Sequence, residues 1–207
     1  MSRPVAVVTG GSGGIGSAVV AELNRRGYDV HSWSRRDGVD AADEAQVEAA
    51  AAALPRWDVL VNNAATLIPG ELAATSWESW RATLRSGLDT AFLSSRAAFR
   101  RMANGSRIVF VSSLSGFQGA EKFPGMAAYV AAKSGLTGLA EALAVEAATR
   151  GIRVNTVSLG SVRTPMLEAS GAPHEPAFDP EQVAPVIAWL AGPESAPLTG
   201  ANIKLEP

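Results

Sequence analysis

Hydrophobic positions along this chain alternate between short apolar runs and longer amphipathic stretches. The apolar runs predict strands over residues 4–9, 28–34, 57–62, 106–112, 152–158 and 201–205. The amphipathic stretches predict helices over residues 14–26, 43–54, 76–85, 87–103, 127–150 and 181–191. The runs 59–61 and 108–111 are apolar on both faces, which is typical of a parallel sheet that helices cover on both sides.

The alternation of strands and helices predicts a doubly wound, Rossmann-like α/β fold with a parallel sheet and helices on both faces. Few residues separate Ser34 from the helix that begins near Asp43. A crossover between parallel strands needs about a dozen residues. The fold is therefore expected to be shortened after the second strand, with a third strand that is either vestigial or missing from a trimmed sheet edge. We expect residues 1–207 to form a single domain.

Composition excludes several classes of function. The 207 residues carry a net charge of −2 and no cysteine, so disulfides, thiolate chemistry and electrostatic attraction to nucleic acid or anionic membranes are not expected. His31 and His174 lie too far apart in the sequence to suggest a metal site. No signal peptide and no apolar run near ~18 residues is seen, which predicts a cytoplasmic protein. The tryptophans are expected to pack in the core or between helices: Trp33, Trp57, Trp77, Trp80 and Trp189.

A glycine cluster connects the first strand to the first helix, from Gly10 to Gly16. Glycines allow the backbone to approach a bound pyrophosphate, and a helix N-terminus offers free N–H groups and partial positive charge. An ordinary turn can also be rich in glycine. The strand before the cluster and the helix after it favour nucleotide binding.

Tyr129 and Lys133 stand at positions i and i+4 of a predicted helix, so they share a face. A free tyrosine has a pKa of about 10, and a nearby ammonium group lowers it. The pair then forms a general acid/base. A surface tyrosine with a solvated lysine is the alternative, although the chain holds only two tyrosines and three lysines.

Polar residues follow two other predicted strands. Ser113 comes at the end of one of them, where ligands bind in open α/β sheets. Its hydroxyl either donates to a substrate oxygen or stabilises the strand-end turn. Asn62 and Asn63 follow another strand, and they either stabilise turns or line a nucleotide groove.

Taken together, these segments resemble the short-chain dehydrogenase/reductase family almost from end to end. The matching segments are Thr9-Gly10-x-x-x-Gly14-Ile15-Gly16, Asn62-Asn63-Ala64-Ala65, Ser113, Tyr129-x-x-x-Lys133 and the stretch from Gly151 to Thr164. The resemblance implies that Tyr129 protonates a carbonyl oxygen, that Ser113 hydrogen-bonds the same oxygen, and that Lys133 binds the nicotinamide ribose and lowers the tyrosine pKa. It also implies that Asp40 contacts the adenine and that Val162 and Thr164 lie near the carboxamide. The expected cofactor-binding residues are Gly10, Ser12, Gly14, Ile15, Gly16, Ser34, Arg35, Asp40, Asn62, Ala64, Tyr129, Lys133, Val162 and Thr164.

NADP(H) is the expected cofactor. A site that prefers NAD(H) places an acidic residue at the end of the second strand, where this chain has Ser34, followed by Arg35 and Arg36. A guanidinium can hold a 2′-phosphate with two hydrogen bonds, whereas a carboxylate repels it. Asp37 is expected to lie past this turn, and solvated arginines are the alternative. The expected partner is a small-molecule carbonyl or alcohol substrate, and a homodimer or homotetramer is expected.

Three departures from the family pattern affect these expectations. Gly87 stands where the family has an asparagine that supports a water beside the lysine. Leu159-Gly160 replaces the usual Pro-Gly, and about three extra residues, 121–123, lie between Ser113 and Tyr129 and are expected to bulge over the substrate pocket. Because of Gly87, two alternatives stay open: a non-redox enzyme (isomerase, lyase or cyclase), or a catalytically weak dinucleotide-binding sensor.

Overall fold

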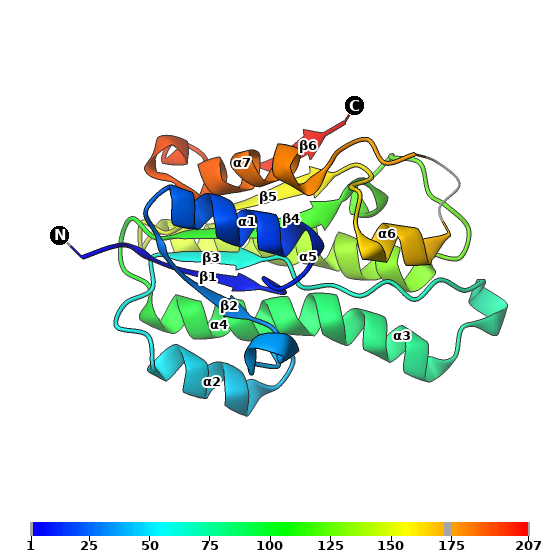
Figure 1. Ribbon diagram of the computed structural model, residues 1–207, viewed down its shortest axis with the longest axis horizontal. Coiled ribbons are helices and arrows are strands. Elements are labelled where there is room, and N and C mark those ends of the chain that lie inside the picture. The colour runs from blue at the N-terminus through cyan, green and yellow to red at the C-terminus, as the bar shows by residue number, and fades with distance from the viewer. Residues whose placement is uncertain (1, 172–174, 207) are drawn as a thin grey trace.

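The computed structural model describes residues 2–171 and 175–206, in which six parallel strands form one sheet with the order β2-β1-β3-β4-β5-β6 (Figure 1). The strands are β1 (Val5–Thr9), β2 (Asp29–Trp33), β3 (Val59–Asn62), β4 (Arg107–Ser113), β5 (Arg153–Leu159) and β6 (Asn202–Leu205). All six strand predictions are confirmed, with boundaries that move by two residues at most.

Helices connect the strands in the predicted order. They are α1 (Gly14–Arg25), α2 (Glu44–Ala52), α3 (Trp77–Leu84), α4 (Thr90–Arg101), α5 (Ala127–Ala148), α6 (Pro165–Ser170) and α7 (Pro180–Ala191). Helix α6 was not predicted. Its start is set by the Thr164 hydroxyl, which accepts the N–H of Leu167, and it ends at Gly171 in the left-handed region.

Side chains alternate across the sheet and supply two separate cores, one under each layer of helices. Val7, Leu60 and Phe110 point to the face covered by α2, α4 and α5. Val8 and Val61 point to the opposite face, which α1 and α7 cover. This two-residue period on strands that are buried on both sides confirms the doubly wound fold.

The sheet ends at β2, which pairs only with β1 in the described part of the chain. From β2 the chain passes through a 3₁₀ turn (Arg35–Asp37) and α2, then returns to form β3 on the other side of β1. The shortening predicted after the second strand is therefore a trimmed edge. Trp33 and Trp57 fill the corner that results, with ring centroids 5.1 Å apart at an interplanar angle of 66°.

The sequence had predicted two separate helices over residues 76–85 and 87–103. In the structure, a π-helix (Arg85–Asp89) joins α3 and α4 into one continuous helical run. Gly87 is buried in the middle of this π-helix. A π-helix inserts an extra residue into a helix, and such insertions are frequent at functional sites.

The tryptophan predictions are partly wrong. Trp33 and Trp57 are buried as expected. Trp77, in contrast, is 70% exposed, because it lies in the first turn of α3 on the side that faces solvent, with the Arg81 guanidinium 5.7 Å from its ring centroid.

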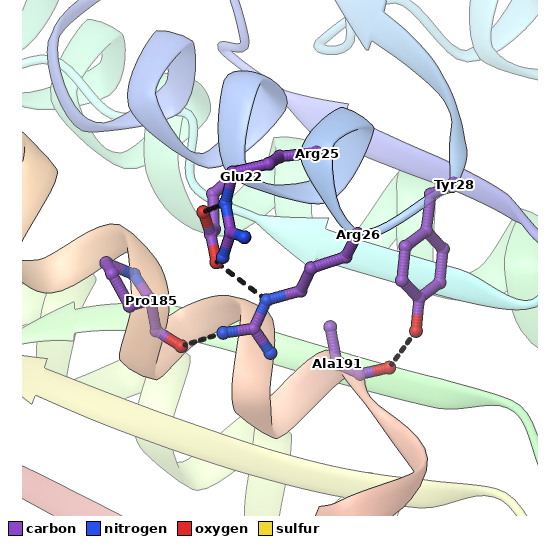
Figure 2. Close-up of polar contacts among 6 residues, drawn as sticks. All are labelled: Glu22, Arg25, Arg26, Tyr28, Pro185 and Ala191. Atoms are coloured by element: carbon purple, nitrogen blue, oxygen red, sulfur yellow. Dashed lines mark hydrogen bonds and ion pairs between the residues drawn. The ribbon is translucent and has the colours of Figure 1, made fainter.

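Polar contacts attach the end of α1 to α7 (Figure 2). Arg26 donates to the carbonyl of Pro185 at 3.2 Å, and the Tyr28 hydroxyl donates to the carbonyl of Ala191 at 3.3 Å. Glu22 accepts from both Arg25 and Arg26 at 2.7 Å. These two hydrogen-bonded guanidinium groups hold the pKa of Glu22 at about 2.

The depressed pKa of Glu22 predicts a pH-dependent stability difference. The pKa in the folded state lies below the ordinary value of 4.5, so the ionised group stabilises the fold above pH 4.5 and loses this effect as the pH falls towards 2. We expect Glu22→Gln to lower the free energy of unfolding by about 1 kcal/mol at pH 7, given the group's partial exposure, and by about half as much at pH 3. Urea unfolding at both pH values measures the difference. Glu71→Gln, at an exposed carboxylate without an ion pair in the described structure, is the control. A loss that is the same at both pH values would contradict the assignment.

Candidate active site

A cleft of about 1410 Å³ lies over the carboxyl ends of the strands. Its walls include residues that follow β1, β2, β3, β4 and β5, and it spans the point between β1 and β3 where the strand order reverses. Ligands of open α/β sheets bind at this switch point. Pockets for a single small ligand measure roughly 300–1,000 Å³, so this cleft has room for more than a small substrate alone.

The glycine turn forms one wall of the cleft. Gly10 has a φ of +66°, in the left-handed region that favours glycine. At Gly16, a Cβ would lie 2.1 Å from the carbonyl oxygen of Gly10, so only glycine lets the first turn of α1 pack this close. Gly10, Ser12, Gly14 and Ile15 line the cleft, whereas Gly16 lies behind its wall and acts through packing.

Thr9 and Asn63 hold the glycine turn against the end of β3. The Thr9 hydroxyl accepts the N–H groups of Asn63 at 3.0 Å and of Ala64 at 3.1 Å. The Asn63 side chain donates back to the carbonyls of Thr9 and Gly10 at 3.1 and 3.3 Å. The sequence pattern gave no sign that Thr9 has this role.

The Asn62 side chain does not lie where the sequence had suggested. Its side chain is buried away from the cleft, where it donates to the Ser95 hydroxyl at 2.8 Å and accepts from the Ser94 hydroxyl at 2.6 Å. The expectation that Asn62 contacts a cofactor is therefore wrong for its side chain, which instead joins β3 to α4. Ala64 and Asn63 line the cleft at this point.

The far end of the cleft is lined by Ser34, Arg35, Arg36 and Asp40. Arg36 donates to the carbonyl of Ser12 at 3.2 Å, which ties the turn after β2 to the glycine turn. Arg35 is exposed and has no ion pair in the part of the chain that the structure describes. Arg85, at the start of the π-helix, also lines this end, donates to the carbonyl of Ala42 at 3.2 Å and was not anticipated.

Ser113, Tyr129 and Lys133 meet in one corner of the cleft. Ser113 ends β4 and hydrogen-bonds Tyr129, near the start of α5. Lys133 is only 4% exposed, and its amine donates to the carbonyl of Val111 at 2.8 Å. The same amine lies 5.6 Å from the centroid of the Tyr129 ring. The predicted grouping of these three side chains is therefore present.

Burial sets the charge state of this corner. Desolvation raises the pKa of Tyr129 to about 12, against a smaller lowering effect of the hydrogen bond with Ser113. Desolvation lowers the pKa of Lys133 to about 8. The expectation that the lysine lowers the tyrosine pKa is not met here, because burial is the larger effect for both groups. Tyr129 is protonated at neutral pH and is poised as a proton donor.

The three departures from the family pattern surround this corner. A Cβ at position 87 would lie 3.7 Å from Ala132, the neighbour of Lys133. The segment around residues 121–123 lines the cleft as predicted. Lys122 holds the loop that carries this segment together by donating to the carbonyls of Phe117 and Ala120 at 2.6 and 3.0 Å. Gly160 donates to the carbonyl of Leu205 at 2.9 Å, so the Leu-Gly turn continues the sheet without proline.

Further residues complete the cleft. Val162 and Thr164 line it after β5, as predicted. Lys204 and Glu206 also line it, with their charged groups 3.2 Å apart and the Lys204 amine 4.2 Å from the Phe117 ring centroid. No sequence motif marks these two residues near the end of the chain.

The described residues contain no group of three or more histidine, cysteine, aspartate or glutamate side chains that could hold a metal ion. His174 lies outside the described residues. In the same described portion, every helix is too short or too polar to cross a membrane.

Known proteins match the chain over nearly its full length. The family model described as enoyl-(acyl carrier protein) reductase matches residues 38–206. The acetoacetyl-CoA reductase of an Acinetobacter strain is 30% identical over 241 aligned positions, which cover 98% of this chain and 96% of the relative. The trans-4-hydroxycyclohexanecarboxylate dehydrogenase of Sinomonas cyclohexanicum is 34% identical, with 93% of this chain and 72% of the relative covered.

A solved structure agrees with these matches. A short-chain dehydrogenase from Burkholderia cenocepacia, in complex with NADP, superposes with a TM-score of 0.86 at 29% identity and covers 98% of this chain and 96% of that one. The alignment with the Acinetobacter relative is longer than this chain of 207 residues, so the relative has insertions where this chain is short. The sheet, the cleft and the matches over nearly the whole chain together show that the chain belongs to the short-chain dehydrogenase/reductase family of oxidoreductases.

Proposed function

We propose that this protein is an NADP(H)-dependent oxidoreductase that interconverts a carbonyl compound and the corresponding alcohol. The observation that carries the proposal is the meeting of Ser113, Tyr129 and Lys133 in the cleft that the glycine turn also lines. The reductase and dehydrogenase names of the relatives, and the NADP complex of the Burkholderia protein, support it.

The cleft residues fit a nicotinamide dinucleotide. A Cβ at Gly14 would lie 3.0 Å from the Thr164 methyl group, so glycine keeps open the space between the turn and the loop after β5. We assign the pyrophosphate to the N-terminus of α1, the 2′-phosphate to Arg35, and the nicotinamide to Val162 and Thr164. When bound, the nicotinamide supplies or accepts a hydride at the substrate carbon.

We call the corner formed by Ser113, Tyr129 and Lys133 the catalytic corner. Its side chains bind and protonate the substrate oxygen. Ser113 accepts the N–H of Ser115 at 3.1 Å, and its hydroxyl, which hydrogen-bonds Tyr129, turns its proton to a substrate carbonyl when one binds between the two side chains. Tyr129 donates its proton to the same oxygen. The Lys133 amine stabilises the negative charge that develops on Tyr129, and it also binds the nicotinamide ribose.

Gly87 affects only the supply of protons to Lys133. We propose that backbone groups of the π-helix hold the water that an asparagine side chain supports elsewhere in the family. The complete set of Ser113, Tyr129 and Lys133 favours redox chemistry over an isomerase, a lyase, a cyclase or a sensor.

The substrate end of the cleft favours a carbonyl compound with an apolar body. Around the catalytic corner it is lined mainly by apolar side chains, namely Leu67, Pro69, Leu114, Phe123, Met126, Met166 and Leu167. Burying apolar surface contributes roughly 25 cal/mol per Å², so a hydrophobic group on the substrate would gain affinity here.

We further propose that the protein forms a homodimer or homotetramer through α4 and α5. Phe92 on α4 is 47% exposed and Val145 on α5 is 76% exposed, which leaves apolar side chains on both helices available for a second copy.

Replacing Tyr129 with phenylalanine tests the acid/base role, because only the hydroxyl is lost. We expect turnover to fall by about 10²-fold or more, with cofactor affinity almost unchanged. Lys133→Met should reduce both turnover and cofactor affinity. The assay follows NADPH oxidation over a panel of ketones, and Tyr28→Phe, the only other tyrosine and remote from the cleft, is the matched control. Near wild-type turnover of Tyr129→Phe would overturn the assignment.

Removing the Arg35 guanidinium tests the choice of cofactor. We expect wild-type protein to bind NADPH more tightly than NADH, and Arg35→Ala to weaken NADPH binding by about tenfold while leaving NADH binding unchanged. Fluorescence titration measures both affinities. Arg153→Ala, at the opposite end of the sheet, controls for the loss of one positive charge. Equal wild-type affinities for the two cofactors would contradict the proposal.

Placing the asparagine of the family pattern at position 87 tests the proposed supply of protons to Lys133 through a water. A Cβ at position 87 would make an ordinary van der Waals contact with Ala132 at 3.7 Å, and asparagine is at least as favourable as glycine inside a helix. Gly87→Asn should therefore leave NADPH-dependent turnover the same or raise it. If wild-type protein and variant both fail to oxidise NADPH across a broad ketone and enone panel, the non-redox function is favoured instead.

A further inference from the structure

The carboxylate of Asp37 lies beside the wall assigned to the 2′-phosphate. Asp37 belongs to the 3₁₀ turn after β2, and its Oδ2 atom accepts from the Ser32 hydroxyl at 2.5 Å and from the Ser34 hydroxyl at 2.6 Å. The Ser34 hydroxyl also lies 2.7 Å from the Ser12 hydroxyl in the glycine turn. Ser12 and Ser34 both line the cleft, so a continuous set of hydrogen bonds joins the carboxylate to the cleft wall.

The turn fixes this carboxylate in place. The N–H of Asp37 donates to the Ser34 hydroxyl at 3.2 Å, so Ser34 and Asp37 hold each other by two reciprocal hydrogen bonds. Gly38 ends the turn with a φ of +87°, which a residue with a side chain rarely adopts. The sequence had suggested that Asp37 lies past this region, whereas the structure turns its carboxylate back towards it.

The hydrogen bonds also decide what the two serines can offer a ligand. A hydroxyl has one proton and two acceptor lone pairs. Ser34 gives its proton to Asp37, so the proton in its contact with Ser12 must come from Ser12. Both protons are therefore engaged in hydrogen bonds within the wall. Ser34 also has both lone pairs occupied, by the N–H of Asp37 and by Ser12, so Ser12 alone of the two serines keeps acceptors for a ligand. A ribose 2′-hydroxyl can donate to such acceptors, whereas a phosphate needs donors.

The charges near this wall are mixed. The hydroxyl donors Ser32 and Ser34 lower the pKa of Asp37, so this carboxylate is ionised at neutral pH. Arg35 and Arg36 provide two positive groups on the same turn. The arginines attract a 2′-phosphate and the carboxylate repels it.

We propose that Asp37 is a specificity-determining residue that weakens the binding of a 2′-phosphate and so limits the preference for NADP(H) over NAD(H). It acts by like-charge repulsion and by engaging the protons of Ser12 and Ser34 in hydrogen bonds within the wall, so that neither proton is available to a phosphate. The inference rests on the proposed function, since it assumes a dinucleotide whose adenosine ribose lies beside Ser34.

Asp37→Asn tests the inference because the amide keeps the shape and one acceptor oxygen but removes the charge. We expect the Kd for NADPH to fall by about tenfold, while the Kd for NADH stays within about twofold of wild type. The gain should shrink between 50 and 300 mM salt, because screening weakens interactions of exposed charges. Asp37→Ala, which frees one hydroxyl proton of the Ser12–Ser34 pair, should give a gain at least as large.

Asp43→Asn is the matched control. Asp43 caps α2 by accepting the N–H of Gln46 at 3.0 Å, lies outside the cleft lining and can be replaced by asparagine as an equally good cap. It should leave both Kd values unchanged. If the ratio of the two Kd values in both Asp37 variants equals that of wild type, the inference is overturned while the proposed function stands. If wild-type protein binds neither dinucleotide, the proposed function fails and the inference fails with it.

Discussion

The close approach of Gly16 to the carbonyl of Gly10 is the constraint on which the cofactor end of the cleft depends. With a Cβ only 2.1 Å from that oxygen, no other residue fits without moving α1 away from the end of β1. The contacts between Thr9 and Asn63 then fix the same turn to β3. One backbone packing contact and one pair of side chains thus determine where the N-terminus of α1 faces the cleft.

The catalytic corner depends on burial rather than on a charge pair. Lys133 is enclosed and held by the carbonyl of Val111, and the same enclosure keeps Tyr129 protonated. The π-helix passes close to this corner, because position 87 faces Ala132 on α5. The π-helix therefore packs against α5 one residue away from Lys133, while the carbonyl of Val111 on β4 holds the amine itself.

Local patterns were sufficient to predict the strands and most of the helices, since each strand is a short apolar run and each long helix has an amphipathic period. The resemblance to a known family added the grouping of Ser113, Tyr129 and Lys133. The sequence could not show that α3 and α4 are continuous, because a π-helix leaves no distinctive residue pattern. The direction of the Asn62 side chain, the return of Asp37 towards Ser34 and the position of Lys204 in the cleft all depend on tertiary contacts between distant segments.

Hydride transfer between a nicotinamide and a carbonyl carbon is the reaction proposed for the cleft. The most direct measurement uses NADPH that carries deuterium at one face of the nicotinamide C4, incubated with the protein and a panel of apolar ketones and 3-oxoacyl thioesters. The proposed function predicts an alcohol product with deuterium on the former carbonyl carbon, one label for each NADPH oxidised. Of two NADPH samples, each labelled on a different face of C4, only one should transfer its deuterium. A product that forms without label while NADPH remains unoxidised would contradict it.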